Sequence, residues 1–180
     1  MLRPILAALL LGLLLHDGAA TAAEATPPVT TPPGAAPREV ALKRVNLLVR
    51  DLDRSLAVYR DILGFRVFQI SESGPQSYSY PVFRLPPQAR LRFCTLDSST
   101  ETRALALTEV KGVDLPAPPA FGTSSPVIRV THFDEVLARL RAAGLRIVEP
   151  RRSKTPEGRE FSELGFTDPD GHVVVLYQLD

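Results

Sequence analysis

Residues 45–65 have the sequence VNLLVRDLDRSLAVYRDILGF, and residues 126–145, PVIRVTHFDEVLARLRAAGL, repeat its pattern in degenerate form. In both stretches an apolar strand pattern is followed by an acidic turn, a short amphipathic helix pattern and a glycine. The glycine that ends the first helix, Gly64, aligns with Gly144 in the second copy. This internal repeat predicts two related halves, and we expect a cleft where the two halves enclose a space.

Each copy is followed by further strand patterns, so each half is predicted to contain a strand, a helix and three more strands. The first half should form strands at 42–50, 66–71, 90–96 and 104–110, with a helix that has Asp53 as its N-cap and ends at Gly64. The second should form strands at 127–131, 146–150, 159–167 and 172–178, with a helix at 134–143. Neither half could bury a helix face and a sheet face alone, so the two should pair. The predicted fold class is therefore α+β, with paired βαβββ modules at residues 39–112 and 125–180.

The N-terminal residues have the pattern of a secretory signal peptide, which we place at residues 1–23. A positive charge precedes an apolar run at 5–15, and small residues with an A-x-A motif at 20–22 follow it. The apolar run is shorter than the roughly 20 residues needed to cross a bilayer, which favours cleavage over an uncleaved anchor. Residues 24–38 are rich in Pro, Thr and Ala and are predicted to form a flexible linker. We therefore expect a secreted or periplasmic protein without a stable membrane anchor.

Composition excludes some classes of partner. The formal net charge of the 180-residue chain is +1, and no block of like charge or basic stripe with interleaved aromatic residues occurs in it, so a nucleic-acid partner is not expected. Cys94 is the only cysteine, which leaves an exported chain without an internal disulfide bond. It lies in an alternating apolar stretch, where we expect a buried and unreactive thiol.

Two motifs resemble a known family: VRDLDRSLAVYRDILGF at 49–65 and FTDPDGHVVVLYQ at 166–178. Both are similar to motifs of the vicinal oxygen chelate superfamily, which includes glyoxalase I, extradiol dioxygenases, fosfomycin-resistance enzymes and bleomycin-binding proteins. The resemblance covers the whole folded region, and it implies two βαβββ modules whose sheets curve around a cleft. In metal-dependent members a divalent ion in that cleft polarises a bidentate oxygen substrate.

The resemblance also implies where metal ligands would lie, with one on the first strand and one on the last strand of each module. These positions are occupied here by Asn46, Glu109, Val127 and Val175. Only Glu109 is a common ligand type, whereas His and carboxylate sites need about three protein ligands. Neither His132 nor His172 matches a ligand position. We therefore predict no metal ligand set and no cofactor, and a divalent metal remains the disfavoured alternative.

Period-two alternation predicts which side chains face the cleft. The expected ligand-binding residues are Asn46, Leu48, Leu107, Glu109, Arg129, Val175 and Tyr177. Because a buried carboxylate needs a partner, one hypothesis is that Arg129 pairs with Glu109. A second is that Arg129 holds an anionic ligand through a bidentate contact. The plainer alternative places Arg129 in solvent at the cleft rim and Glu109 on the surface of its strand.

A long loop at 71–88, SESGPQSYSYPVFRLPPQ, separates two of the predicted strands, and a loop of this length in a small domain is usually functional or mobile. Its aromatic residues Tyr78, Tyr80 and Phe83 either form a lid over the cleft or pack the loop against the domain edge.

These patterns favour an exported glyoxalase-like protein that binds or sequesters a small molecule and is not an enzyme. An anionic small molecule would suit the predicted cleft. The alternative is a metal-dependent lyase, isomerase or dioxygenase of the same superfamily that draws its ligands from elsewhere or from a second subunit. The resemblance is compatible with a homodimer, because members of the superfamily often build their clefts between subunits.

Overall fold

The computed structural model describes residues 41–120 and 122–179. The predicted signal peptide at 1–23 and linker at 24–38 lie outside the described residues. Within the described part of the chain no helix is long and apolar enough to cross a membrane.

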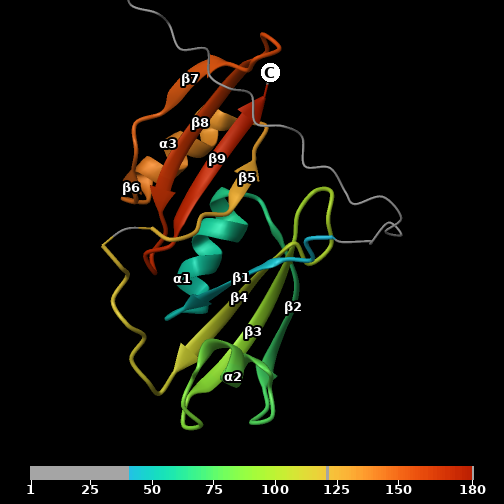
Figure 1. Ribbon diagram of the computed structural model, residues 1–180, viewed down its shortest axis with the longest axis vertical. Coiled ribbons are helices and arrows are strands. Elements are labelled where there is room, and N and C mark those ends of the chain that lie inside the picture. Colours follow the sequence, from blue (N-terminus) through green and yellow to red (C-terminus); the bar gives the residue numbers. More distant parts are fainter. Residues whose placement is uncertain (1–40, 121, 180) are drawn as a thin grey trace, which may run out of the picture. The chain divides into compact units, whose positions relative to one another are not determined.

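Two modules follow one another along the chain, and each forms a sheet (Figure 1). The first consists of β1 (Val45–Val49), α1 (Leu52–Leu56), the π-helical continuation η1 (Ala57–Ile62), β2 (Arg66–Ser73), α2 (Ser79–Phe83), β3 (Arg90–Asp97) and β4 (Leu105–Lys111). The second consists of β5 (Val127–Arg129), α3 (Phe133–Ala142), β6 (Arg146–Ile147), β7 (Arg151–Lys154), β8 (Glu160–Thr167) and β9 (Val173–Leu179). The predicted α+β class with two βαβββ modules is confirmed, and α2 and β7 are additions to it.

The two sheets have the same connectivity, as the sequence repeat predicts. The first sheet has the order β1-β4-β3-β2, and the second has the order β5-β9-β8-β6, with β7 also paired to β8. In each sheet the first strand pairs in parallel with the last one, and the other pairs are antiparallel. The first and last strands of a module are therefore neighbours, so their side chains can meet on one face.

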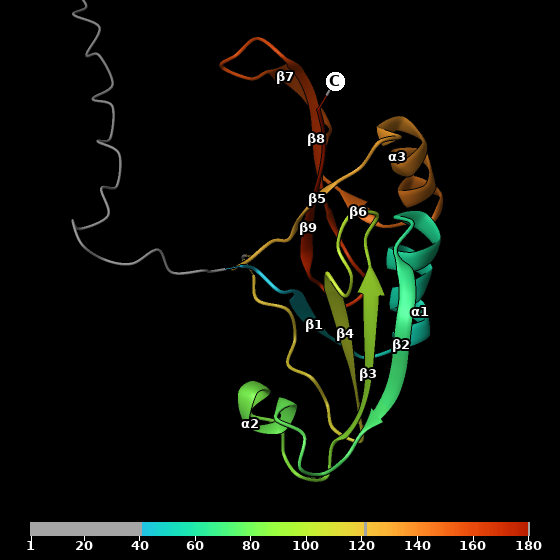
Figure 2. The same ribbon diagram turned by 90° about the vertical axis from the view of Figure 1, so that its right-hand side faces the viewer.

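Helices α1 and α3 lie on the same side of the sheets, whereas α2 lies on the other side of the first sheet (Figure 2). We call the sheet face against α1, η1 and α3 the covered face, and the opposite one the open face. Apolar side chains from both modules form one core on the covered face. They include Leu47, Val49, Leu56, Tyr59, Leu107, Leu140, Phe166, Val174 and Leu176. Since one core serves both modules, its burial stabilises their pairing as well as each module.

The ends of the helices follow the local sequence. The N-cap of α1 is Asp51 and not the predicted Asp53, because the Asp51 carboxylate accepts a hydrogen bond from the backbone N–H of Arg54 at 2.9 Å. Gly64 and Gly144 have φ angles of +84° and +70°, which glycine adopts without the steric cost of a Cβ atom. Both predicted helix ends are therefore correct, while the first helix begins two residues earlier than expected.

The predicted long loop contains α2 and a small apolar cluster on the open face. Tyr80 packs there against Ala89, Leu91 and Val110, and its hydroxyl donates a hydrogen bond to the backbone oxygen of Ala89 at 2.8 Å. Tyr78, in contrast, is 80% exposed. The loop aromatics were expected either to cover the cleft or to pack the loop against the domain, and Tyr80 packs the loop against the domain.

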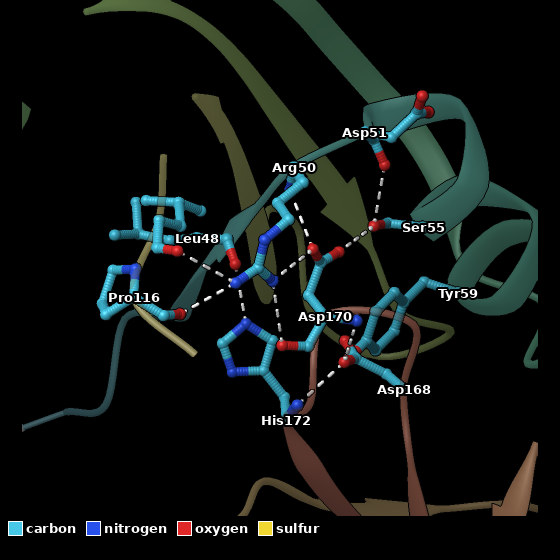
Figure 3. A network of polar contacts seen from close by, with 10 residues as sticks. Leu48, Arg50, Asp51, Ser55, Tyr59, Pro116, Asp168, Asp170 and His172 are labelled. Atoms are coloured by element: carbon cyan, nitrogen blue, oxygen red, sulfur yellow. Dashed lines mark hydrogen bonds and ion pairs between the residues drawn. The ribbon is translucent and has the colours of Figure 1, made fainter. Parts of the chain in front are cut away.

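The two signature motifs meet at the junction of the modules (Figure 3). The Tyr59 hydroxyl, on η1, donates a hydrogen bond to the Asp168 carboxylate at 2.8 Å. The other Asp168 oxygen accepts backbone N–H groups of Asp170 and His172 at 2.9 and 2.8 Å, which fixes the turn before β9. His172 Nε2 lies 2.7 Å from the backbone oxygen of Leu48, so the turn also contacts the end of β1.

Asp170 supplies the second half of this junction. Its Oδ1 accepts the backbone N–H of Arg50 at 2.9 Å and lies 3.3 Å from the Arg50 guanidinium, while the Ser55 hydroxyl donates to Oδ2 at 3.2 Å. Arg50 Nη2 donates in turn to the backbone oxygen of Pro116 at 2.8 Å, in the segment between the modules. The acidic residues of the DPDG motif at 168–171, Asp168 and Asp170, thus hold the modules together. Their carboxylates are already engaged in these hydrogen bonds.

Candidate functional site

The parallel pairing of β1 with β4 decides which residues face the open side of the first sheet. Leu47 is paired with Leu107 and Val49 with Glu109, and both β1 residues are buried in the covered-face core. Leu107 and Glu109 therefore lie on the covered face, and their prediction as cleft residues is wrong. The reason is that six of the seven β4 residues are buried, so the strand has no exposed face from which the sequence could reveal its orientation.

Glu109 has a structural role at the start of α1. Its carboxylate accepts the backbone N–H of Leu52 at 2.8 Å and the Nε–H of Arg92 at 3.0 Å, and it lies 3.6 Å from the ammonium group of Lys111. The same hydrogen bond to Glu109 raises the pKa of Arg92. The predicted Glu109–Arg129 pair is therefore wrong, and so is the alternative of Glu109 on the strand surface. Arg129 is exposed, which agrees with the alternative that placed it in solvent.

The open face of the first sheet carries a polar pair that the sequence analysis missed. Thr108, which is buried, donates a hydrogen bond from its hydroxyl to Asn46 Oδ1 at 3.0 Å. Asn46 was expected on this face, and Thr108 is the β4 residue that takes the place predicted for Glu109. Leu48 also lies on this face, where it packs against the small cluster under α2.

A pocket of about 210 Å³ lies on the same face, towards the beginning of β1, and we call it the first-sheet pocket. It is lined by Arg44, Gln69, Ser71, Phe93, Thr95 and Arg103. The sheet register brings these residues together, since Gln69 pairs with Thr95 and Ser71 with Phe93. The lining residues are thus two arginines, a serine, a threonine, a glutamine and a phenylalanine, with no acidic residue among them.

The two arginines come from the starts of neighbouring strands. The backbone N–H of Val45 donates to the oxygen of Ala104 at 3.2 Å, so the residues that precede β1 and β4 lie side by side. Arg103 has a φ angle of +55°, and its backbone N–H donates to Asp97 Oδ1 at 2.7 Å. Its guanidinium carbon lies 4.2 Å from the centre of the Phe68 ring. No sequence motif marks this arrangement, because Arg103 lies in a surface turn.

The open face of the second sheet carries the remaining residues of the predicted cleft. Val127 is paired with Val175 and Arg129 with Tyr177, and their neighbours Val174 and Leu176 are in the covered-face core. Val127 is 68% exposed. Val175 and Tyr177 therefore lie on the expected face, and a ligand-binding role for them stays a prediction.

The residues at the expected metal positions do not fit a divalent ion. On the open faces, the first and last strands present Asn46 and Thr108 in one module and Val127 and Val175 in the other. The valines offer no donor atom, and Asn46 and Thr108 are hydrogen-bonded to each other. Among residues 41–120 and 122–179, no group of three or more His, Cys, Asp or Glu side chains is arranged to hold a metal. About three protein ligands of these types would be needed.

A second hollow, of about 300 Å³, lies at the start of α3. His132 and Phe133 contribute to it, and so do Asp134 and Arg152, which form an ion pair with each other. Although this hollow is larger, its one lining arginine, Arg152, is already paired with Asp134, and Glu135 adds a second acidic side chain. The first-sheet pocket is therefore the better candidate for a ligand site.

Comparison with known proteins supports the fold. The family model "Glyoxalase/Bleomycin resistance protein/Dioxygenase superfamily" matches residues 41–176. A glyoxalase family protein from Bacillus cereus has a similar structure, with a TM-score of 0.63, 15% identity and coverage of 81% of this chain and 97% of that one. Glyoxalase I from Leishmania major has a TM-score of 0.52 at 23% identity, with 78% of this chain and 87% of that chain covered.

The structure is also similar to that of the fosfomycin resistance protein FosX from Listeria monocytogenes, determined with Mn(II) and a sulfate ion. Its TM-score is 0.51 at 17% identity, with 78% of this chain and 93% of that chain covered. A comparison with curated proteins finds no match. At these identities the structural likenesses establish the fold alone.

Proposed function

Because the chain belongs to the glyoxalase/bleomycin resistance protein/dioxygenase superfamily, we propose that it binds a small molecule on the open face of its first sheet without a resident metal ion. The protein would act by binding or sequestering that molecule, as the bleomycin-binding members of this superfamily do.

One observation carries this proposal: the chemistry of the side chains on the first and last strands of each module. A hydrogen-bonded Asn46–Thr108 pair and two valines occupy the positions from which metal ligands would come. The first-sheet pocket beside the Asn46–Thr108 pair instead offers hydroxyl, amide, guanidinium and aromatic groups. Concave sites with a few convergent polar groups are the usual sites for small ligands.

A metal-dependent lyase, isomerase or dioxygenase is the second candidate function. It is favoured by the structural likeness to FosX, whose structure contains Mn(II). In this chain such an activity would require ligands from residues other than Asn46, Thr108, Val127 and Val175, or from a second copy in a homodimer.

Metal content and binding-site mapping would separate the two functions. The full chain would be purified without chelators, analysed for metals by mass spectrometry, and then screened with and without EDTA against small acids, amines, sugars and aromatic compounds. We expect less than stoichiometric metal, and binding that survives EDTA and shifts the NMR signals of Thr95 and Thr108. A stoichiometric ion that is lost in Asn46→Ala would overturn the proposal.

We also propose that the protein is exported and that its signal peptide is removed. The support is the charged, apolar and small-residue sequence of the first 23 residues. Mass spectrometry of protein from the periplasm or the culture medium should find an N-terminus after residue 22 or 23. Recovery of the chain only from the cytoplasm with Met1 intact would contradict this.

A further inference from the structure

We infer that the first-sheet pocket is a binding site for a compact oxyanion, such as a carboxylate, phosphonate or phosphate group, held between Arg44 and Arg103. This inference rests on the proposed function and names the ligand class of the same site.

The charges around the pocket are the first argument. Two arginines line one small pocket, and none of the six lining residues is acidic. The nearby carboxylate of Asp97 already accepts the backbone N–H of Arg103. Two like charges at one site repel each other, and an anion bound between them offsets that repulsion because it attracts both. Guanidinium groups are also the side chains best suited to bidentate contacts with oxyanions.

The backbone of Arg103 is the second argument. A φ angle of +55° is unfavourable for a residue that carries a Cβ atom, and such outliers often occur at ligand-binding sites. A glycine would relieve this strain, yet the chain has an arginine here and holds it with the Asp97 hydrogen bond. Stacking on the Phe68 ring orients the guanidinium further. The strained turn thus presents a cationic group in a set orientation.

The size and the remaining lining of the pocket define the ligand further. Its volume of about 210 Å³ is smaller than the roughly 300–1,000 Å³ of pockets for drug-sized ligands. Ser71 and Thr95 offer hydroxyl groups, Gln69 offers an amide, and Phe93 offers a partly buried ring. These groups suit a small anion whose oxygens accept several hydrogen bonds and whose short apolar part contacts one aromatic ring.

The first test measures binding of defined anions to the full-length protein at low ionic strength. Acetate, succinate, methylphosphonate, phosphate and sulfate would be titrated, with acetamide as a neutral control for acetate, and side-chain NMR signals of the arginines would be followed. We expect at least one oxyanion to saturate and to shift the Nε signals of Arg44 and Arg103, while acetamide does not. The tightest probe then distinguishes a carboxylate site from a phosphate-like one. Failure of every oxyanion to bind would overturn the inference.

The second test uses glycine variants at Arg103 and Arg84, the two non-glycine residues with positive φ angles in the described part of the chain. Arg103→Gly removes the guanidinium and gives the turn the residue that its backbone favours, so the fold should persist. We expect it to weaken oxyanion binding roughly ten- to a hundredfold, the usual effect of losing hydrogen bonds to a charged group. Arg84, with a φ angle of +54° at the end of α2, does not line the pocket. Arg84→Gly is therefore the matched control: it removes the same charge and should leave oxyanion affinity unchanged.

A corresponding pair of variants, at Arg44 and Lys43, tests the other side of the pocket. Arg44→Gln should weaken binding by a similar factor, whereas Lys43→Gln, at the exposed neighbouring residue, should not. If the control variants weaken binding as much as the pocket variants do, the attraction comes from the overall charge and the inference is overturned.

The outcomes also separate this inference from the proposed function. A neutral compound that binds the open face, unaffected by Arg44→Gln and Arg103→Gly, overturns the oxyanion site and leaves small-molecule binding standing. A stoichiometric metal ion overturns metal-free binding, while arginine-dependent oxyanion binding after EDTA treatment still supports the site.

Discussion

Tyr59 donates a hydrogen bond from its hydroxyl to Asp168 Oδ2 at 2.8 Å, and this contact joins the helical segment of the first module to the last turn of the second. Both residues are buried. Burial and the neighbouring Asp168 raise the pKa of Tyr59 well above its ordinary value, so the hydroxyl stays protonated and able to donate. The contact is one of several that make the two modules depend on each other.

Replacing Tyr59 by Phe should therefore destabilise the whole domain. The variant leaves one oxygen of a buried carboxylate without its donor, and such a loss costs about 1–3 kcal/mol. Urea denaturation monitored by circular dichroism would measure the free energy of unfolding. Tyr78→Phe, at a residue that is 80% exposed, is the control and should change it by less than about 0.5 kcal/mol. Equal effects in the two variants would contradict a structural role for the junction.

Glu109→Gln should also reduce stability, by about 1–3 kcal/mol, without weakening oxyanion binding. The variant removes the charge that Arg92 and Lys111 contact and alters the acceptor at the start of α1. Thermal and urea unfolding would measure the effect. Glu160→Gln breaks an exposed pair with Lys154 and should cost less than about 1 kcal/mol. A loss of binding at unchanged stability would instead assign Glu109 to the ligand site.

The thiol of Cys94 should be unreactive in the folded protein. It should also make the free energy of unfolding depend on pH in the alkaline range. Burial raises its pKa from 9.0 to about 11. Between these values the unfolded thiol has lost its proton and the folded thiol retains it, so this contribution to stability is complete below pH 9 and is lost as the pH rises towards 11. Tyr59, whose pKa is also raised, acts with the same sign at higher pH.

Urea denaturation at pH 8 and at pH 10 should therefore show lower stability at pH 10, and Cys94→Ala should reduce the difference. Labelling with a thiol reagent at pH 8 should proceed only when denaturant is present. Rapid labelling of the native protein would show that the thiol is accessible and ionised.

Gly171→Ala should be more damaging than an alanine at another glycine with a positive φ angle. Gly171 has a φ angle of +94°, and a Cβ atom there would lie 2.2 Å from Cγ of Pro118. We expect a cost of about 3 kcal/mol, from backbone strain of about 1–2 kcal/mol and from steric overlap. Gly158, with a φ angle of +84° and no atom within 4 Å of an added Cβ, should cost about 1–2 kcal/mol as alanine. Urea denaturation of both variants would compare them, and equal costs would show that Pro118 moves away freely.

Much of the architecture could be predicted from local sequence. The repeated strand–helix–glycine pattern predicted two modules, and both glycines that end its helices adopt positive φ angles. Errors were confined to local detail. Residues 151–154, where the sequence patterns predicted no strand, form β7, whose Arg151 and Lys154 lie opposite Glu163 and Glu160 of β8. That pairing supplies cross-strand charge partners that the residues' own sequence neighbourhood does not reveal.

The candidate site was predicted less well, and Glu109 shows why. Its strand is buried on both faces, so the pattern of apolar residues could not tell which face carries the carboxylate. Only the parallel register with β1 places Glu109 under α1 and Thr108 beside Asn46.

The sequence by itself determined the fold family, the two-module organisation and the glycines that end both helices, because these depend on periodicity and on residues that are close together in the chain. Only the tertiary structure decided which side chains share the open face. Arg44 and Arg103 contribute to one pocket because β1 and β4, distant in sequence, start side by side. Asp168 and Asp170, which belong to a family motif, are instead occupied by Tyr59 and Arg50 at the module junction. Contacts between distant segments depend on register and packing of the whole domain, and these are set when its common core forms.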